Sequence, residues 1–368
     1  MDSHDRGLRT TFMLSEFHGS CAKAIKMGSR FRGNDGVGGL QNASLYPSFP
    51  RRRESSATSG TSGDPRKRRL IKQWRIAVLT LAFAIGVLSS TGCSPEAAVE
   101  NPARHGIISM SPNITETLFA LGQGDRIIAV TAYCDYPPEV ESLPDVGGYI
   151  DPNLERITML DPGLIILPGK HEKVAALAKQ NGFPVLHAHM DSLATIHDGI
   201  TRIGEALECP DEATALWNQI QSELDAIRAA VEGQPRPKVL LINTRSNHDL
   251  NNLFTVGSKS FLSEMLDVAG GENLFGDETV DYFEASKESV VVRAPDVIIE
   301  CHAGEGLSQE ELQQYRDDWN ALPSLPAVES ERIYLFEESY ALRPGPRIAL
   351  IAAQFARWLH PDIEIPAP

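Results

Sequence analysis

Two stretches of the sequence decide the fold: ERITMLDPGLII at residues 155–166 and ESVVVRAPDVII at residues 288–299. Each begins with a glutamate, places a proline seven positions later and then enters a run of β-branched, apolar residues. A second pair lies upstream, TLFALGQGD at 117–125 and EMLDVAGGE at 264–272. Because the same order of motifs occurs twice, the sequence predicts two similar lobes, each with alternating helices and strands.

Short apolar runs alternate with helical patterns from residue 104 to the end of the chain. Continuous apolar strands separated by helices are typical of parallel sheets that are covered on both faces. The expected fold class is therefore α/β, with two Rossmann-like lobes, parallel sheets and a ligand cleft between the lobes. The runs predicted as strands are 106–109, 126–133, 163–167, 184–189, 238–244, 296–301 and 332–336.

One long helix separates the two halves. Leu216, Ile220, Leu224, Ile227 and Val231 form a one-sided apolar stripe at helical spacing. A helix of this length extends about 30 Å, roughly the diameter of a domain. We therefore expect an N-terminal lobe at 104–210, a connecting helix at 211–232 and a C-terminal lobe at 233–368.

The N-terminal part of the chain differs in charge from the rest. Residues 1–92 contain 15 basic and 6 acidic side chains, whereas residues 93–368 contain 19 basic and 43 acidic ones. Such an acidic body is a poor match for nucleic acid or anionic lipid surfaces, and it suits a partner with a basic docking face.

The segment 66–92 has the pattern of a secretory signal peptide. Basic residues at 66–75 precede an uncharged apolar stretch at 76–88, which is shorter than the roughly 20 residues of a membrane-spanning helix. The Gly92-Cys93 pair resembles a bacterial lipobox, so Cys93 is the expected lipidation site and 93–103 the expected tether. Residues 1–65 lack sustained periodicity and are interpreted as a non-native or disordered extension.

Signatures of enzymatic and metal chemistry are missing from residues 93–368, the part of the chain expected to be exported. This part of the sequence contains no G-x-S-x-G motif, no Walker loop, no H-E-x-x-H motif and no strand-linked G-x-G-x-x-G motif, so no catalytic residue is predicted. Cys134, Cys209 and Cys301 have no metal-ligand spacing, and whether any two form a disulfide stays open. His187 and His189 share a strand face and are expected at the surface or the cleft rim. A bare zinc or manganese site is the alternative, although no third or fourth ligand is obviously placed to complete it. His302 comes directly after the predicted strand 296–301.

Aromatic residues in predicted loops offer a stronger binding signal. They lie beside glycine, proline or acidic residues and not on apolar periodic faces, and flat rings suit a large planar ligand. The residues are Tyr133, Tyr136, Tyr149, Phe254, Tyr282 and Tyr340.

Five motifs in order resemble the helical-backbone class of periplasmic solute-binding proteins of ABC importers. The resemblance covers about residues 104–360 and is greatest to the vitamin B12-binding members, with iron-siderophore and haem binders as relatives. The motifs are Ser111-Pro-Asn-Ile-Thr-Glu116, Cys134-Asp-Tyr-Pro-Pro138, Asn153-Leu-Glu-Arg-Ile157, Gly270-Gly-Glu-Asn273 and Arg343-Pro-Gly-Pro-Arg-Ile348.

This resemblance implies roles for individual residues. Family members dock on the permease through one glutamate on each lobe, at positions that match Glu155 and Glu288. The B12 binders line their cleft with aromatic residues, and Tyr149, Pro168 and Tyr282 stand where enterobacterial members have tryptophan. The matching ligand-binding positions are Tyr133, Tyr149, Phe254, Tyr282 and Tyr340.

Arg343 is expected either to neutralise an anionic group of the ligand or to brace the last helix.

The sequence thus predicts a non-enzymatic lipoprotein of the periplasm or cell envelope that binds a corrinoid such as vitamin B12. No resident cofactor and no metal-binding residue of its own is expected. Its partners would be an ABC permease dimer with its ATPase subunits. A ferric siderophore or haem is the alternative ligand, and a bare-metal binder or a hydrolase is a more distant alternative.

Overall fold

The computed structural model describes residues 105–246 and 248–368. Its N-terminal lobe contains a four-stranded parallel sheet in the order β2-β1-β3-β4. The elements are β1 (Ile107–Ser109), α3 (Pro112–Ala120), β2 (Ile127–Ala129), α4 (Leu154–Leu160), β3 (Leu164–Leu167), α5 (Glu172–Asn181), β4 (Val185–His187) and α6 (Leu193–Ala206), with short 3-10 helices at Gly124–Arg126 and Pro138–Ser142.

The C-terminal lobe contains a larger sheet in the order β10-β9-β5-β6-β8, with β7 paired to β5. Strand β6 runs antiparallel to both β5 and β8, whereas β9 runs parallel to β5 and β10 runs parallel to β9. The elements are β5 (Lys238–Arg245), β6 (Leu253–Val256), α8 (Phe261–Val268), β7 (Glu272–Asn273), β8 (Tyr282–Ala285), α9 (Lys287–Arg293), β9 (Val297–Cys301), α10 (Gln309–Asp318), α11 (Pro326–Glu329), β10 (Ile333–Phe336) and α12 (Ile348–Leu359), with 3-10 helices at Trp319–Ala321 and Ser339–Leu342.

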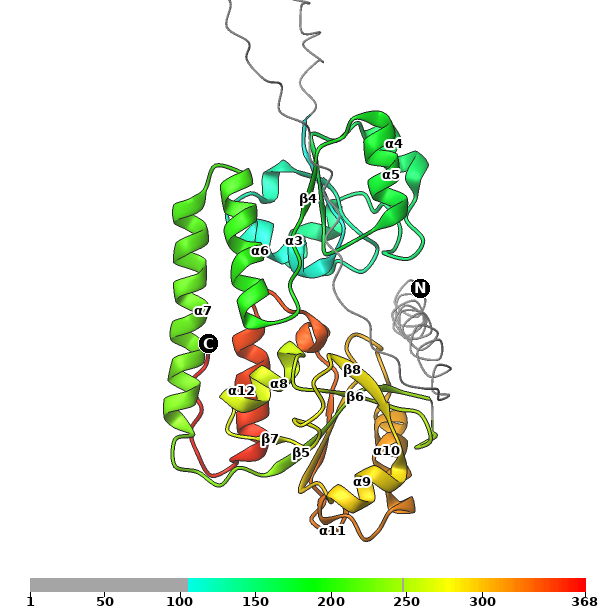
Figure 1. The fold of residues 1–368 in the computed structure, drawn as a ribbon, viewed down its shortest axis with the longest axis vertical. Coiled ribbons are helices and arrows are strands. Elements are labelled where there is room, and N and C mark those ends of the chain that lie inside the picture. The colour runs from blue at the N-terminus through cyan, green and yellow to red at the C-terminus, as the bar shows by residue number, and fades with distance from the viewer. Residues whose placement is uncertain (1–104, 247) are drawn as a thin grey trace, which may run out of the picture. The chain divides into compact units, whose positions relative to one another are not determined.

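Helix α7 (Pro210–Ala230) connects the two lobes and packs against α6 and α12 (Figure 1). Ile220, Leu224 and Ile227 on its inner face are buried. They belong to one hydrophobic cluster that also contains Ile107 of the first sheet and Phe355 of α12. The core is therefore continuous from one lobe to the other, with α7 as a shared wall.

The predicted α/β fold class is confirmed, and each of the predicted strand runs contains a strand. Two details differ from the expectation. The second sheet is mixed, because a short connection joins β5 to β6 and β6 then runs alongside β5 in the opposite direction. Phe254 and Tyr282 lie on β6 and β8, so the prediction that they occupy loops was wrong.

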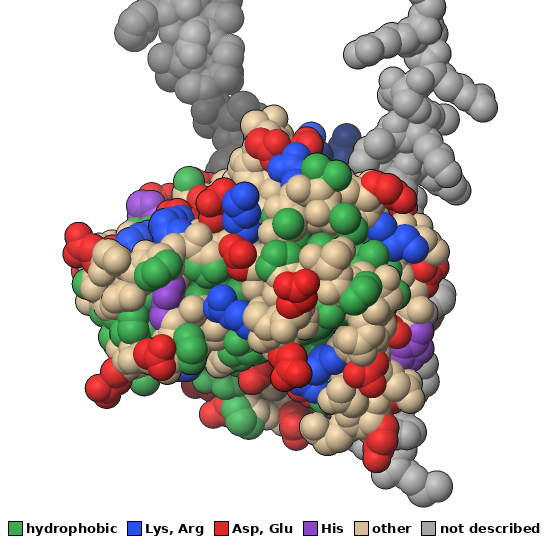
Figure 2. All heavy atoms as spheres, turned by 90° about the horizontal axis from the view of Figure 1, so that it is seen from below, with side chains coloured by type: hydrophobic (Ala, Val, Ile, Leu, Met, Phe, Trp, Pro, Cys, Tyr) green, Lys and Arg blue, Asp and Glu red, His purple; other side chains and the backbone are tan. Residues whose placement is uncertain are grey.

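Acidic and basic side chains alternate on the face seen from below in Figure 1, with apolar groups between them (Figure 2). Across the described part of the chain, no helix has the length and apolar character needed to cross a bilayer. The predicted extension, signal peptide, tether and Cys93 lie outside the described residues.

Candidate functional site

A cavity of about 770 Å³ lies at the carboxyl ends of the strands of the N-terminal lobe. Because these strands are parallel, their carboxyl ends meet at one edge of the sheet, where α/β proteins bind ligands. We call it the strand-end cavity, and its surface is mostly apolar. Its lining residues are Met110, Ser111, Pro112, Thr131, Tyr149, Pro168, Gly169, Lys170, His187 and His189.

A second cavity, of about 790 Å³, lies at the opposite ends of the strands of the C-terminal lobe. Arg236, Asp296 and Arg332 line it, and none of the ligand residues predicted from the sequence does. Its charged lining and its position at the amino ends of the strands make it the weaker candidate for an apolar ligand.

Tyr149 is the predicted aromatic residue that lines the strand-end cavity. Its hydroxyl donates to the Lys170 carbonyl at 3.2 Å, and its ring meets the ring of His171 edge-on at 4.7 Å. Burial raises the pKa of the Tyr149 hydroxyl. The preceding turn needs Gly147, which has a φ of +83° and where a Cβ would lie 2.7 Å from the Asp151 carbonyl oxygen.

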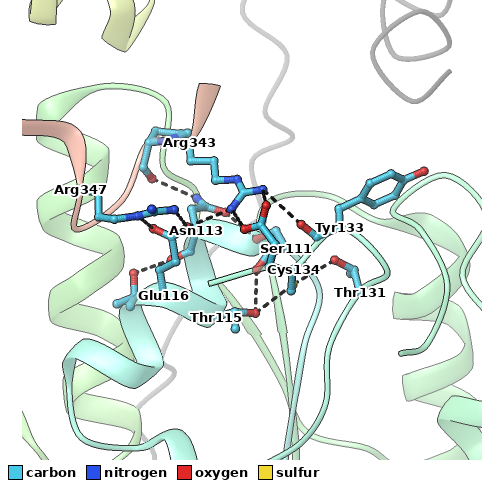
Figure 3. A network of polar contacts seen from close by, with 12 residues as sticks. Ser111, Asn113, Thr115, Glu116, Thr131, Tyr133, Cys134, Arg343 and Arg347 are labelled. Carbon is cyan, nitrogen blue, oxygen red and sulfur yellow. Dashed lines mark hydrogen bonds and ion pairs between the residues drawn. The ribbon is translucent and has the colours of Figure 1, made fainter. Parts of the chain in front are cut away.

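The other predicted ligand residues do not line this cavity. Tyr282 lies on β8 in the other lobe, where its hydroxyl accepts a hydrogen bond from Ser260 at 3.1 Å. Burial raises the pKa of Tyr282 to about 12. Tyr340 packs edge-on against Phe336 at 5.7 Å, and Phe254 lies on β6. Tyr133 extends away from the arginines of Figure 3.

Arg343 takes part in an ion-pair network that joins the two lobes (Figure 3). It lies in the segment before α12, and its guanidinium binds both oxygens of Asp135 and one oxygen of Glu116. Arg347 donates to the two oxygens of the same glutamate at 2.9 and 2.5 Å. The Glu116 side chain is 2% exposed, so its negative charge is compensated by these two arginines and not by water.

The surroundings of Arg343 favour the bracing role over the ligand-binding role. Burial alone would lower its pKa, but Asp135 and Glu116 outweigh burial and raise it. A further donor contact reaches the Tyr133 carbonyl at 3.3 Å. Its guanidinium is thus directed at protein acceptors in the first lobe.

Sequence reasoning missed most of the cavity lining. Met110, Ser111, Thr131 and Lys170 were not predicted, whereas His187 and His189 were expected at the surface or the cleft rim, with a bare-metal site as the alternative. The available signal was position, because each of these residues lies within a predicted strand run or shortly after its end. Among the described residues, no group of three His, Cys, Asp or Glu side chains is placed to hold a metal ion.

Glu155 and Glu288 occupy equivalent places on two equivalent helices. Both are exposed residues in the first turn, of α4 and α9 respectively. Each helix has a side-chain N-cap and ends at a residue in the left-handed conformation. One turn beyond each glutamate lies an exposed apolar side chain, Met159 at 79% and Val292 at 84% exposure. The internal repeat of the sequence is therefore a repeat of surface structure.

Comparisons with known proteins agree with this architecture. Residues 107–340 match the family described as "Periplasmic binding protein". The chain is 29% identical over 257 residues to the vitamin B12-binding protein of Photorhabdus laumondii, which covers 69% of this chain and 87% of that protein.

Two solved structures extend the comparison. The periplasmic vitamin B12 binding protein of Vibrio cholerae superposes with a TM-score of 0.58 at 26% identity, covering 70% of this chain and 97% of that one. The periplasmic heme-binding protein of Roseiflexus sp. RS-1 in its apo form superposes with a TM-score of 0.60 at 25% identity, covering 70% and 98%.

Proposed function

The chain belongs to the periplasmic binding protein family, the substrate-binding components of ABC importers, and we propose that its substrate is a corrinoid such as vitamin B12. The observation that carries this proposal is the strand-end cavity. It combines a volume of about 770 Å³ with a mostly apolar surface and one tyrosine ring. Sites of this size and character suit a large ligand that is held mainly by contact area. Relatives named as vitamin B12-binding proteins add support.

Titration calorimetry with cyanocobalamin tests the proposal. We expect the wild-type protein to bind it and Tyr149→Ala to weaken binding by about 2 kcal/mol, or roughly 30-fold, because a central aromatic contact is lost. Tyr149→Phe is the matched control, since it keeps the ring and should bind within about twofold of wild type. Absence of cyanocobalamin binding by the wild-type protein would contradict the corrinoid assignment.

Haem is the second candidate, and one observation favours it specifically. Two histidines and a tyrosine line the strand-end cavity, and these side chains are common iron ligands. The same calorimetric series with haemin and with a ferric siderophore separates the ligands. Tight binding of one of these, without binding of cyanocobalamin, would assign the protein to that ligand.

We further propose that Glu155 and Glu288 dock the protein on the two subunits of the permease. The support is their equivalence, because two lobes that face two subunits need one charge contact each. Met159 and Val292 would add an apolar contact beside each charge, as both side chains are largely exposed.

The family indicates a periplasmic location. Attachment to the membrane through a lipid on Cys93 is a proposal that rests on the signal-peptide pattern alone, because this residue lies outside the described part of the chain.

A further inference from the structure

Three histidines surround the strand-end cavity and its rim. His187 ends β4, and His189 follows it in the chain. Both line the cavity, whereas His171 is buried behind Tyr149 as the N-cap residue of α5. Their hydrogen bonds show which ring nitrogens are already used and which can meet a ligand.

Both ring nitrogens of His171 and of His189 have partners. In His171, Nε2 contacts the Tyr149 carbonyl, and Nδ1 accepts from the Val174 amide at 3.3 Å. In His189, Nε2 pairs with Asp191 at 2.8 Å, and Nδ1 lies 3.3 Å from the Pro168 carbonyl. Neither ring presents an unused nitrogen to a ligand.

His187 is different. Its Nδ1 lies 2.8 Å from the Gly169 carbonyl oxygen, which can only accept a hydrogen bond. Nδ1 therefore carries the proton in the neutral ring, and the lone pair is on Nε2. Within residues 105–246 and 248–368, Nε2 of His187 has no hydrogen-bond or ion-pair partner. This arrangement, with Nδ1–H bound to a backbone carbonyl, is the one that orients histidines which bind metals through Nε2.

The surroundings restrict the kind of metal that can bind. A bare ion needs three or four ligands, and the described residues offer no group of three His, Cys, Asp or Glu side chains. A metal that brings its own ring of donors needs only one or two axial ligands from the protein. The mostly apolar wall of the cavity suits the flat face of such a ring.

We infer that His187 Nε2 is an axial ligand to the metal of a bound tetrapyrrole, either the cobalt of a corrinoid or the iron of haem. The inference rests on the proposed function and deepens it. In the binding step, the Nε2 lone pair forms a bond to the metal while a metal-bound water leaves. The metal keeps its oxidation state, and the proton stays on Nδ1, which continues to donate to the Gly169 carbonyl.

Absorption spectroscopy with aquocobalamin and with haemin, each added separately to purified protein, tests this inference. We expect the tetrapyrrole that binds to change from a water-ligated to a histidine-ligated spectrum. His187→Ala should lose this spectral change, and added imidazole should restore it by occupying the vacated position. His197→Ala is the matched control and should keep the change, because His197 stacks on Trp217 outside the strand-end cavity.

The outcomes distinguish this inference from the proposed function. If the wild-type protein binds neither tetrapyrrole, the proposed function fails and the ligation fails with it. If a tetrapyrrole binds but its spectrum is unchanged, or if His187→Ala keeps the histidine-ligated spectrum, only the ligation by His187 is overturned. Circular dichroism of each variant identifies any loss that is due to unfolding.

Discussion

At the scale of single residues, the most unusual feature is a buried ion cluster in the C-terminal lobe. Arg245 donates to Glu300 at 3.0 Å, and both side chains are 1% exposed. His302 contacts Glu300 at 3.2 Å and Glu305 at 3.1 Å. Asp318 binds Arg245 at 2.9 Å. Buried charges of this kind are tolerated only when each one is compensated, so every member depends on the others.

His302 makes stability dependent on pH. Burial alone would lower its pKa, but hydrogen bonds with Glu300 and Glu305 outweigh burial and raise it to about 9. The folded protein therefore holds this proton more tightly than the unfolded chain, whose histidine pKa is about 6.5. The resulting stabilisation is complete below that value and is lost as the pH rises through about 9.

We expect the urea concentration at the unfolding midpoint of the wild-type protein to decrease when the pH is raised from 6.5 to 9.5. The decrease should be smaller in His302→Gln. The variant should also be less stable at pH 6.5, because it removes a cation from among carboxylates. Equal pH dependence in the two proteins would show that His302 is not the group responsible.

At the scale of elements, α4 and α9 are the pair that the sequence repeat predicted. Asn153 and Ser286 cap them, and Ile157 and Val290 attach them to the core at equivalent positions. Acidic residues also favour helix N-termini by about 0.3–1 kcal/mol, which would explain either glutamate by itself. That effect does not explain why both helices also expose an apolar side chain one turn later.

The double substitution Glu155→Ala and Glu288→Ala should abolish ligand-dependent transport. Ligand affinity and thermal stability should change little, because both side chains are exposed and lie outside the strand-end cavity. The measurement is ligand-stimulated ATP hydrolysis by the permease–ATPase complex in proteoliposomes.

Glu172→Ala is a matched control for the docking experiment. Glu172 is also an exposed glutamate in the first turn of a helix of the N-terminal lobe, yet it lies outside the repeat. Its removal should leave stimulation unchanged. Normal stimulation by the double variant, or its unfolding, would refute the docking assignment.

At the scale of the whole molecule, the two lobes are held together by the shared core along α7 and by the network around Glu116. The network joins α3 of one lobe to the segment before α12 of the other. Asn113 adds a hydrogen bond to the Pro344 carbonyl at 3.1 Å. Because the Glu116 side chain is 2% exposed, its two arginines cannot be replaced by water without a conformational change.

Glu116→Gln should lower the free energy of unfolding by about 3 kcal/mol, because it leaves two arginines without their shared carboxylate. Urea unfolding measures the loss, and hydrogen exchange should increase at residues 343–347. Asp198→Asn is the control, since it removes the exposed pair with Arg202 and should cost at most about 0.5 kcal/mol. A loss no greater than that of the control would show that the network does not hold the lobes.

The sequence by itself determined the fold class, seven strand positions, the stripe of α7 and the repeat that contains Glu155 and Glu288. These features depend on hydrophobic periodicity and on motifs that span only a few residues, and both can be read from the sequence without knowledge of distant contacts. Strands β6, β7 and β8 were missed. Strands β6 and β8 pair with each other in antiparallel fashion although they are far apart in the chain, and only tertiary packing brings them together.

Only the tertiary structure decided which side chains meet. The strand-end cavity brings together Ser111, Thr131, Pro168 and His187 because parallel strands end at one edge, although they are far apart in the chain. Arg343 is directed at protein carboxylates because the segment before α12 lies beside Glu116 of α3 and Asp135. Hydrogen bonds and ion pairs act over a few ångströms, so they depend on how distant segments pack, and local sequence patterns do not contain that information.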